Sequence, residues 1–331
     1  MAVITIWGAG SWGAVLGRVL TNAGHRVTVW SHRDTGALLT SRRHPYLPDL
    51  VIPEAMVITA DMADACRRAE IALMAVPSPY VRQTAMAAAP FLSPGTVVFS
   101  ASKGIEKDTL LTMTGIMAQE LPAGVRLGAL SGPSHAEEVA LDLPTAVVSA
   151  SPDLAAAEAV QALFEGSCLR VYTNSDLLGV ELCGAVKNII ALAAGVCAGL
   201  GYGDNTKAAL VTRGMAEIRR LGLAMGCREE TFAGLAGIGD LFVTASSPHS
   251  RNYRCGQLIG RGLSPEAAAA EIGMVVEGIN ALPAAAVLSE RYRVEMPITR
   301  ALYGVVFASA DPRKAVLSLM ARDTRSELEP R

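Results

Sequence analysis

A glycine-rich turn near the N-terminus constrains this chain more than any other feature. The turn, Gly8-Ala9-Gly10-Ser11-Trp12-Gly13, follows an apolar stretch at 3–7 and precedes an alanine-rich stretch of helical pattern. In this context the first glycine permits a tight turn, the second lets the backbone approach a pyrophosphate, and the third lets the helix pack closely on the sheet. The amides at the start of the helix favour an anion. The motif therefore predicts a dinucleotide site, the alternative being a glycine-rich turn without a ligand.

Short apolar runs alternate with alanine-rich stretches through the first half of the chain. The runs lie at 3–7, 27–30, 71–76, 97–100, 127–130, 145–150 and 169–172, and stretches such as 14–23, 61–69 and 79–89 separate them. Such runs are typical of strands that are buried on both faces. Because strand and helix alternate, we predict an α/β fold with a doubly wound parallel sheet.

The strand pattern stops after Tyr172. The segment Asn174-Ser175-Asp176 offers N-cap oxygens for a long helix that runs to about Leu200. Further helical patterns lie at 207–226, 251–262, 264–272, 276–290 and 311–321. Since 331 residues exceed what one hydrophobic core usually covers, we predict two domains: a dinucleotide-binding domain at 1–177 and an all-α substrate-binding domain at 178–331.

Composition excludes several classes of protein. The chain is 51% hydrophobic and 18% charged, which excludes disorder, and its net charge of -2 comes without a basic block for nucleic acid or an anionic membrane. The longest uncharged apolar run, 188–203, contains four glycines, and the N-terminus has no signal-peptide pattern. The six cysteines form no CxxC pair. We expect a cytoplasmic protein without membrane insertion, nucleic-acid partner, disulfide framework or metal site.

Only five of the 29 basic residues are lysines, so a lysine in an apolar segment needs an explanation. Lys103 follows the fourth predicted strand, at the edge where open α/β sheets bind ligands. Lys187 lies inside the long apolar helix, on one face with Gly184, Ala191 and Ala194, whose small size leaves space for a ligand. A desolvated ammonium near a second cation has a lowered pKa and can protonate a carbonyl oxygen. We predict that Lys187 is a general acid/base; the alternative is a structural lysine at a domain seam.

Other polar segments are candidates for binding anions. The segment 131–136 follows the fifth predicted strand, 234–241 brings an acid out of a glycine-rich loop, and Ser250-Arg251-Asn252 opens a helix whose amides and guanidinium suit a phosphate. Their structural alternatives are a turn, a helix cap and a surface cation. His32 and Arg33 follow the second strand, where NAD-binding proteins usually carry an acid. Their charge favours the 2′-phosphate of NADP, unless both are ordinary loop residues.

Taken together, these motifs resemble those of the bacterial NAD(P)-dependent glycerol-3-phosphate dehydrogenases over essentially the whole chain. The matching segments are GAGSWG at 8–13, SASKGIE at 100–106, SGPSHAEE at 131–138, AVKNIIALAAG at 185–195, GLAGIGDL at 234–241, SRNYRCG at 250–256 and VVEGINA at 275–281. The resemblance implies a Rossmann-like domain followed by an all-α domain. It also implies a cytoplasmic homodimer that uses NADPH, with NADH as a possible second cofactor. Its reaction would be the reversible reduction of dihydroxyacetone phosphate to sn-glycerol 3-phosphate for glycerophospholipid biosynthesis.

The resemblance further implies roles for single residues. Lys187 matches the general acid/base of the family. Substrate contacts are implied at Lys103, Gly132, Ser134, Lys187, Asp240, Ser250, Arg251 and Asn252. Dinucleotide contacts are implied at Gly8, Gly10, Ser11, Trp12, Gly13, His32, Arg33, Lys103, Ala136, Arg251, Val275 and Glu277.

A small dianion with a ketone needs a cationic phosphate grip and a proton donor aimed at its oxygen. We expect 250–252 to hold the phosphate, Lys103 to support the substrate electrostatically, and Asp240 to orient Lys187. Two alternatives remain open: a reductase of another small keto acid such as ketopantoate, and an NADPH-sensing module without turnover. The sequence leaves open the NADPH/NADH ratio, feedback inhibition, the dimer surface, the extent of domain closure and the roles of the cysteines.

Overall fold

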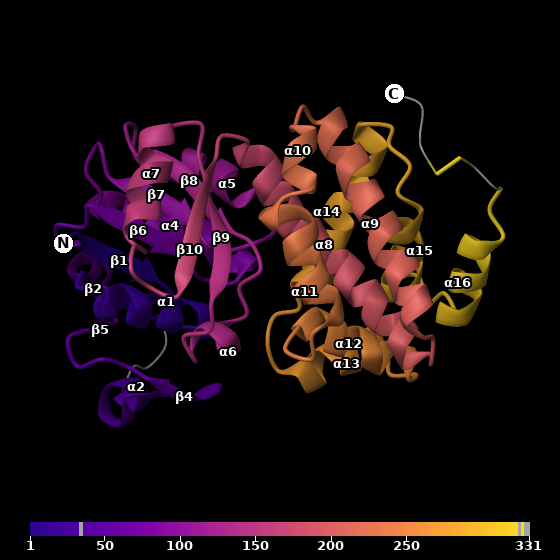
Figure 1. Ribbon diagram of the computed structural model, residues 1–331, viewed down its shortest axis with the longest axis horizontal. Coiled ribbons are helices and arrows are strands. Elements are labelled where there is room, and N and C mark those ends of the chain that lie inside the picture. The colour runs from indigo at the N-terminus through magenta and orange to yellow at the C-terminus, as the bar shows by residue number, and fades with distance from the viewer. Residues whose placement is uncertain (33–35, 324–325, 328–331) are drawn as a thin grey trace.

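The apolar runs of the first half form one eight-stranded sheet in the computed structural model, which describes residues 1–32, 36–323 and 326–327 (Figure 1). The strand order across the sheet is β10-β9-β8-β7-β6-β1-β2-β5. These strands are β1 (Val3–Trp7), β2 (Arg26–Trp30), β5 (Val57–Thr59), β6 (Ile71–Met74), β7 (Val97–Ser100), β8 (Arg126–Ser131), β9 (Thr145–Ala150) and β10 (Leu169–Asn174). A separate hairpin joins β3 (Arg43–His44) to β4 (Leu47–Val51).

The direction of the last two strands differs from the prediction. From β5 through β2, β1, β6 and β7 to β8, neighbouring strands run parallel. However, β9 pairs antiparallel with β8, and β10 runs parallel with β9. The prediction of a purely parallel sheet is therefore wrong for β9 and β10. An apolar run buried on both faces looks the same in either direction, so the pattern could not report this reversal.

Helices cover both faces of the sheet, as a doubly wound fold requires. One face packs against α1 (Ser11–Asn22), α6 (Ala136–Val139) and α7 (Leu154–Ala162), and the other against α3 (Met62–Cys66), α4 (Val81–Ala88) and α5 (Met113–Glu120); α2 (Gly36–Ser41) follows β2. Along β1, Ile4 and Ile6 belong to the first core layer and Trp7 to the second. Successive side chains enter opposite layers, which explains why the whole strand is apolar.

The second half is helical and is built around α8 (Leu177–Gly199), which is buried from Gly179 to Cys197 (Figure 1). The other helices are α9 (Asp204–Ala224), α10 (Glu229–Phe232), α11 (Asp240–Ser246), α12 (Arg251–Gly260), α13 (Pro265–Ile272), α14 (Glu277–Arg291), α15 (Pro297–Phe307) and α16 (Pro312–Met320). A Cβ at Gly195 would collide with the Tyr253 carbonyl oxygen, so this glycine lets α8 and α12 approach closely. By length and composition α8 could cross a membrane, yet 89% of its apolar window is buried inside the protein, as in a core helix.

The fold class is confirmed apart from the strand reversal: a doubly wound α/β domain precedes a helical one. The last strand ends at Asn174 and α8 begins at Leu177, while the boundary at 177/178 remains a prediction. Strands β3 to β5 and helices α2, α5, α6, α7, α10, α11 and α15 lie outside the segments named in the prediction. All six cysteines are unpaired, and Cys168 alone among them is not fully buried.

Candidate active site

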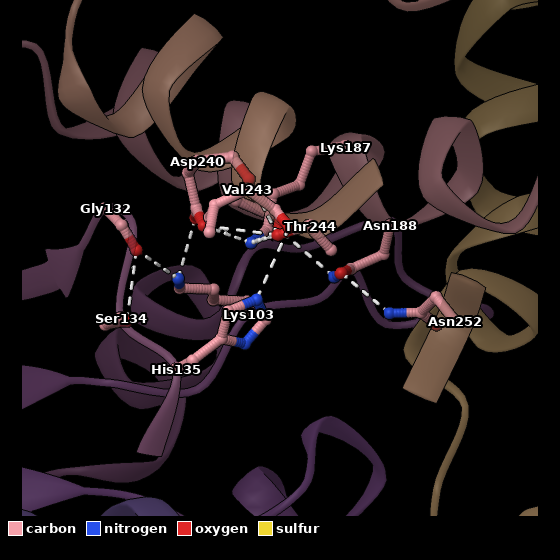
Figure 2. Close-up of polar contacts among 11 residues, drawn as sticks. Lys103, Gly132, Ser134, His135, Lys187, Asn188, Asp240, Val243, Thr244 and Asn252 are labelled. Carbon is pink, nitrogen blue, oxygen red and sulfur yellow. Dashed lines mark hydrogen bonds and ion pairs between the residues drawn. The ribbon is translucent and has the colours of Figure 1, made fainter. Parts of the chain in front are cut away.

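The carboxyl ends of β7 and β8 meet helices α8 and α11 at a cluster of charged side chains (Figure 2). Lys103 comes from the loop after β7, Gly132 from the loop after β8, Lys187 from the middle of α8 and Asp240 from the first turn of α11. The π-helical segment Leu235–Gly239 turns the chain into α11, with a non-helical backbone at its central glycine. The glycine-rich segment presents Asp240, the acid singled out from the sequence, and places it beside the carboxyl ends of β7 and β8.

Asp240 lies at the centre of the cluster and is 1% exposed. Its two carboxylate oxygens accept from different lysines: the Lys103 Nζ lies 2.7 Å from Oδ2, and the Lys187 Nζ donates to Oδ1. Burial alone would raise the pKa of Asp240, but the two ammonium groups outweigh it and hold this pKa below its usual value. The carboxylate stays ionised between two cations, so the cluster has an excess positive charge for an anionic ligand.

Lys187 is 5% exposed and donates a second hydrogen bond, 2.7 Å long, to Thr244 Oγ1. The pKa of Lys187 is lowered to about 7, mainly by burial; Asp240 opposes this shift and the nearby Lys103 adds to it. The predicted environment of a desolvated ammonium beside a second cation is confirmed. Such a group can both give and take a proton near neutral pH. Ala191 and Ala194 lie wholly in the core, so the ligand space predicted beside them is wrong.

The loop after β8 is held from both sides. Gly132 has φ +131°, a conformation that favours glycine, and its carbonyl oxygen accepts from Lys103 Nζ at 2.9 Å and from Ser134 Oγ at 3.0 Å. On the helical side, His135 Nε2 lies 3.4 Å from the Val243 carbonyl oxygen. This loop therefore fixes the position of Lys103 at the domain junction.

The predicted phosphate cluster opens α12 but is partly engaged by the protein. Ser250 caps the helix, and its hydroxyl accepts from the Tyr253 amide at 3.2 Å. Asn252 is buried; its side chain donates to Asn188 Oδ1 at 2.9 Å and accepts from the Gly278 amide at 2.8 Å. Asn188 is thus a tie between α8 and α12, one residue from Lys187 (Figure 2). Arg251 is half-buried; its Nη1 donates to the Val275 carbonyl oxygen at 3.2 Å, and within the described part of the chain its other guanidinium nitrogens remain for an anion.

The glycine-rich turn has the geometry expected of a dinucleotide motif. Gly8 has φ +120°, and a Cβ there would lie 2.7 Å from the Ala75 carbonyl oxygen. A Cβ at Gly13 would collide with the Gly8 carbonyl oxygen, so the turn and the helix pack without side chains between them. A Cβ at Gly10 would meet no described atom within 4 Å, which leaves the start of α1 open to a ligand. These residues fit a bound pyrophosphate.

The other predicted cofactor residues are spread around this turn. Ser11 and Trp12 begin α1 and are half-buried, Ala136 begins α6, and Val275 accepts from Arg251 Nη1 at 3.2 Å. His32 is exposed just after β2, with its ring 6.1 Å from that of Trp30. Arg33 lies outside the described residues.

Some residues of the site were not found in the sequence. Thr244 stands one helical turn after Asp240, which is a signal that could have indicated its contact with Lys187. Glu277, which the resemblance implies as a cofactor contact, accepts from the amide and hydroxyl of Ser78. Nothing in the local sequence of Ser78 indicates a partner almost 200 positions away.

Comparison with known proteins identifies the family. Residues 3–157 match the family model described as "NAD-dependent glycerol-3-phosphate dehydrogenase N-terminus", and residues 176–317 match the model of the C-terminus. The chain belongs to the NAD-dependent glycerol-3-phosphate dehydrogenase family. It is therefore an oxidoreductase, and the resemblance seen in the motifs is confirmed.

Relatives match over almost the full length. The chain is 54% identical to "Glycerol-3-phosphate dehydrogenase [NAD(P)+] 2" of Lactobacillus delbrueckii subsp. bulgaricus, with 99% of each chain covered. It is 49% identical to the glycerol-3-phosphate dehydrogenase [NAD(P)+] of Bacillus subtilis, covering 99% of this chain and 97% of the relative. The crystal structure of glycerol-3-phosphate dehydrogenase from Coxiella burnetii superposes with a TM-score of 0.92 at 36% identity, covering 97% of this chain and 99% of the other.

Proposed function

We propose that this protein is a glycerol-3-phosphate dehydrogenase that reduces dihydroxyacetone phosphate to sn-glycerol 3-phosphate, reversibly and with NADPH as the preferred cofactor. The observation that carries the proposal is the buried Lys103–Asp240–Lys187 cluster, at the sheet edge that also bears the glycine-rich turn. A ketone with a phosphate group matches this chemistry, because the cluster offers a proton donor and surplus positive charge. We propose a role in glycerophospholipid biosynthesis in the cytoplasm on the basis of the family alone.

Lys187 is the general acid of the reduction. Its ammonium donates a proton to the carbonyl oxygen of the substrate as the carbon is reduced, and in the reverse reaction the neutral amine takes a proton from the alcohol. Asp240 and Thr244 hold the Lys187 Nζ in place, so that its third donor position can face the substrate. When bound, the nicotinamide cofactor supplies the hydride.

Other residues bind and orient the substrate. Lys103 adds positive charge beside the reacting oxygen and is itself fixed by Asp240 and the Gly132 carbonyl oxygen. Arg251 and the amides at the start of α12 bind the phosphate, with Ser250 and Asn252 holding that end of the helix. Gly132 and Ser134 form the wall of the site on the sheet side.

The glycine-rich turn would hold the cofactor, with the amides at the start of α1 binding its pyrophosphate. Gly8, Gly10, Ser11, Trp12 and Gly13 form that cradle. The remaining contacts that we propose come from His32, Arg33, Lys103, Ala136, Arg251, Val275 and Glu277. His32 is exposed directly after β2, at the position where NAD-binding proteins usually carry an acid, and this supports a 2′-phosphate and hence NADPH. We also propose a homodimer, as the family implies.

Turnover assays with both cofactors test the proposal. At equal subsaturating concentrations we expect faster oxidation of NADPH than of NADH when dihydroxyacetone phosphate is added, and none with ketopantoate. Lys187→Met should abolish turnover while NADPH binding persists, and Lys314→Met, which changes an exposed lysine of α16, serves as the control. Activity with ketopantoate would favour a keto-acid reductase. NADPH binding without any turnover would favour a sensing module.

The keto-acid reductase alternative has only a likeness of fold behind it. A ketopantoate reductase structure from Ralstonia eutropha superposes with a TM-score of 0.61 at 17% identity, which is a likeness of fold alone.

A further inference from the structure

Lys103 lines one side of a small, partly enclosed cavity. Its volume is about 10 Å³, and its walls come from the ends of β7 and β8 and from α8, including Ser100, Ser131, Glu181 and Gly184. This volume corresponds to the space needed by the centre of a single water molecule. A water is stable in such a place when it has at least two polar partners.

One wall of the cavity carries an unsatisfied polar atom. Ser131 is 4% exposed, and its hydroxyl has no hydrogen-bond partner among the described residues. A buried hydroxyl without a partner retains the cost of leaving water, so such atoms usually bond to protein or to an internal water. The missing partner of the Ser131 hydroxyl therefore indicates that the cavity holds a small polar ligand.

Gly184 keeps this space open. A Cβ at Gly184 would lie 3.1 Å from Ser131 Oγ and 3.3 Å from Lys103 Cγ, closer than side chains normally pack. Any larger residue at this point of α8 would press on both the hydroxyl and the stem of the lysine. Gly184 therefore leaves room both for the cavity and for the side chain of Lys103.

Glu181, another residue that lines the cavity, carries a buried carboxyl group. Glu181 on α8 accepts from the Thr114 amide at 2.8 Å and bonds to the Thr114 hydroxyl, so it joins α8 to the start of α5. Burial raises the pKa of Glu181, although the donors of Thr114 oppose the shift. Each carboxyl oxygen has a second lone pair, so it can also accept a hydrogen bond from a water in the cavity.

We propose that one water molecule occupies this cavity, joins Ser131 to Glu181, and makes Glu181 a positioning residue for Lys103. The connection is short, since Ser131 precedes Gly132, whose carbonyl oxygen accepts from the Lys103 Nζ at 2.9 Å. Fixing Ser131 thus fixes one of the two anchors of Lys103, and the other anchor is Asp240. The kinetic part of this inference rests on the proposed function, whereas the water itself does not.

Crystallography tests the water independently of activity. A high-resolution structure of the wild type should show one ordered water within hydrogen-bond distance of Ser131 Oγ and Glu181, and Gly184→Ala should displace it. If the cavity is dry, or if Ser131 Oγ bonds to a backbone carbonyl oxygen instead, the proposal is wrong. This result stands whether or not the wild type reduces dihydroxyacetone phosphate, so the two proposals fail separately.

Kinetics test the positioning role. Ser131→Ala should lower kcat about fivefold, while the KM for the cofactor changes less than about twofold, because a small displacement near a reacting group acts on the chemical step. Ser149→Ala is the matched control: it removes a buried serine hydroxyl of the same sheet, which donates to Ala157. Equal kcat values in the two variants would overturn the positioning role.

Substitutions of Glu181 separate positioning from general stability. Glu181→Leu should lower kcat about tenfold or more, and Glu181→Gln should recover most of that loss because the amide keeps an acceptor and a donor. The control is Glu217→Gln, since Glu217 is another buried carboxyl, bonded to Ile298 and Thr299 away from the site. It should reduce stability without lowering kcat. A Glu181→Gln variant as slow as Glu181→Leu would contradict the proposal.

Discussion

Glu277 in the first turn of α14 accepts two hydrogen bonds from Ser78, one from its amide at 2.9 Å and one from its hydroxyl at 2.5 Å. The arrangement recurs where Glu181 meets Thr114 and where Glu217 meets Thr299. In each case a carboxyl group, buried in Glu181 and Glu217 and half-buried in Glu277, accepts from both the N–H and the O–H of one residue at the start of a helix. The first two contacts join helices α14 and α8 of the helical half to segments of the sheet half.

Ser78→Ala should weaken the tie to Glu277 while leaving the amide bond in place. Loss of one hydrogen bond to this half-buried carboxyl group should reduce the free energy of unfolding by about 1 kcal/mol. Urea unfolding at neutral pH measures this change. The control is Ser93→Ala at an exposed serine, which should stay within about 0.5 kcal/mol of the wild type. Equal stability of the two variants would mean that the Glu277 contact contributes little.

The lowered pKa of Lys187 predicts opposite pH profiles for the two directions of reaction. Reduction needs the ammonium, which predominates at pH values well below the pKa of about 7 and is lost as the pH rises through it. Oxidation needs the neutral amine, which is lost as the pH falls through the same value. Measurements of kcat in both directions, from about pH 5.5 to about pH 9, should therefore give mirrored curves. If kcat falls on the same side of the pH range in both directions, the titrating group is not Lys187.

Arg251→Ala should act mainly on the binding of substrate. The loss of a charged hydrogen bond to a phosphate costs about 1.5–3 kcal/mol, which corresponds to a rise in the KM for dihydroxyacetone phosphate of about 10–100-fold. Arg254→Ala, an exposed arginine on the same helix, should leave this KM within about twofold. An unchanged KM in Arg251→Ala would move the phosphate site elsewhere.

Much of the fold could be predicted because it depends on local patterns. The glycine-rich turn, the buried strands and α8 each have a signal within one short window of sequence. The direction of β9 has no such signal, because its apolar residues would suit either orientation. Helix α15 was missed although Pro297 stands at its first position, where proline is favoured.

The site could be predicted as a set of segments but not as a geometry. Lys103 and Lys187 could be singled out because lysine is rare in this chain. Both lie where the carboxyl ends of the strands meet the helical domain. Asp240 accepts from both lysines, and these contacts span 137 positions of sequence for Lys103 and 53 for Lys187. No local pattern reports contacts between residues so far apart. Ser78 and Glu181 carry no local signal at all, since their importance comes entirely from what packs against them.

Arg18 and Asp142 connect the helix of the glycine-rich turn with the end of α6. The guanidinium makes two bonds to the carboxylate, at 3.0 and 2.7 Å, and a third to the Val139 carbonyl oxygen at 3.0 Å. The bond from Arg18 lowers the pKa of Asp142. Ionised Asp142 therefore stabilises the fold above the unfolded pKa of about 4, and this contribution is lost as the pH falls through the lower folded value.

Asp142→Asn should thus reduce the free energy of unfolding at neutral pH and do so less in acid. Because the Asp142 side chain is 62% exposed, solvent screening limits the expected loss to about 0.5–1 kcal/mol. Urea unfolding at about pH 7 and at about pH 4 should show the difference from wild type shrinking toward the acid end. Asp64→Asn is the control, since the Asp64–Arg67 pair lies on the surface and should cost less. A loss for Asp142→Asn that is independent of pH would show that its effect comes from the shape of the loop rather than from the charge.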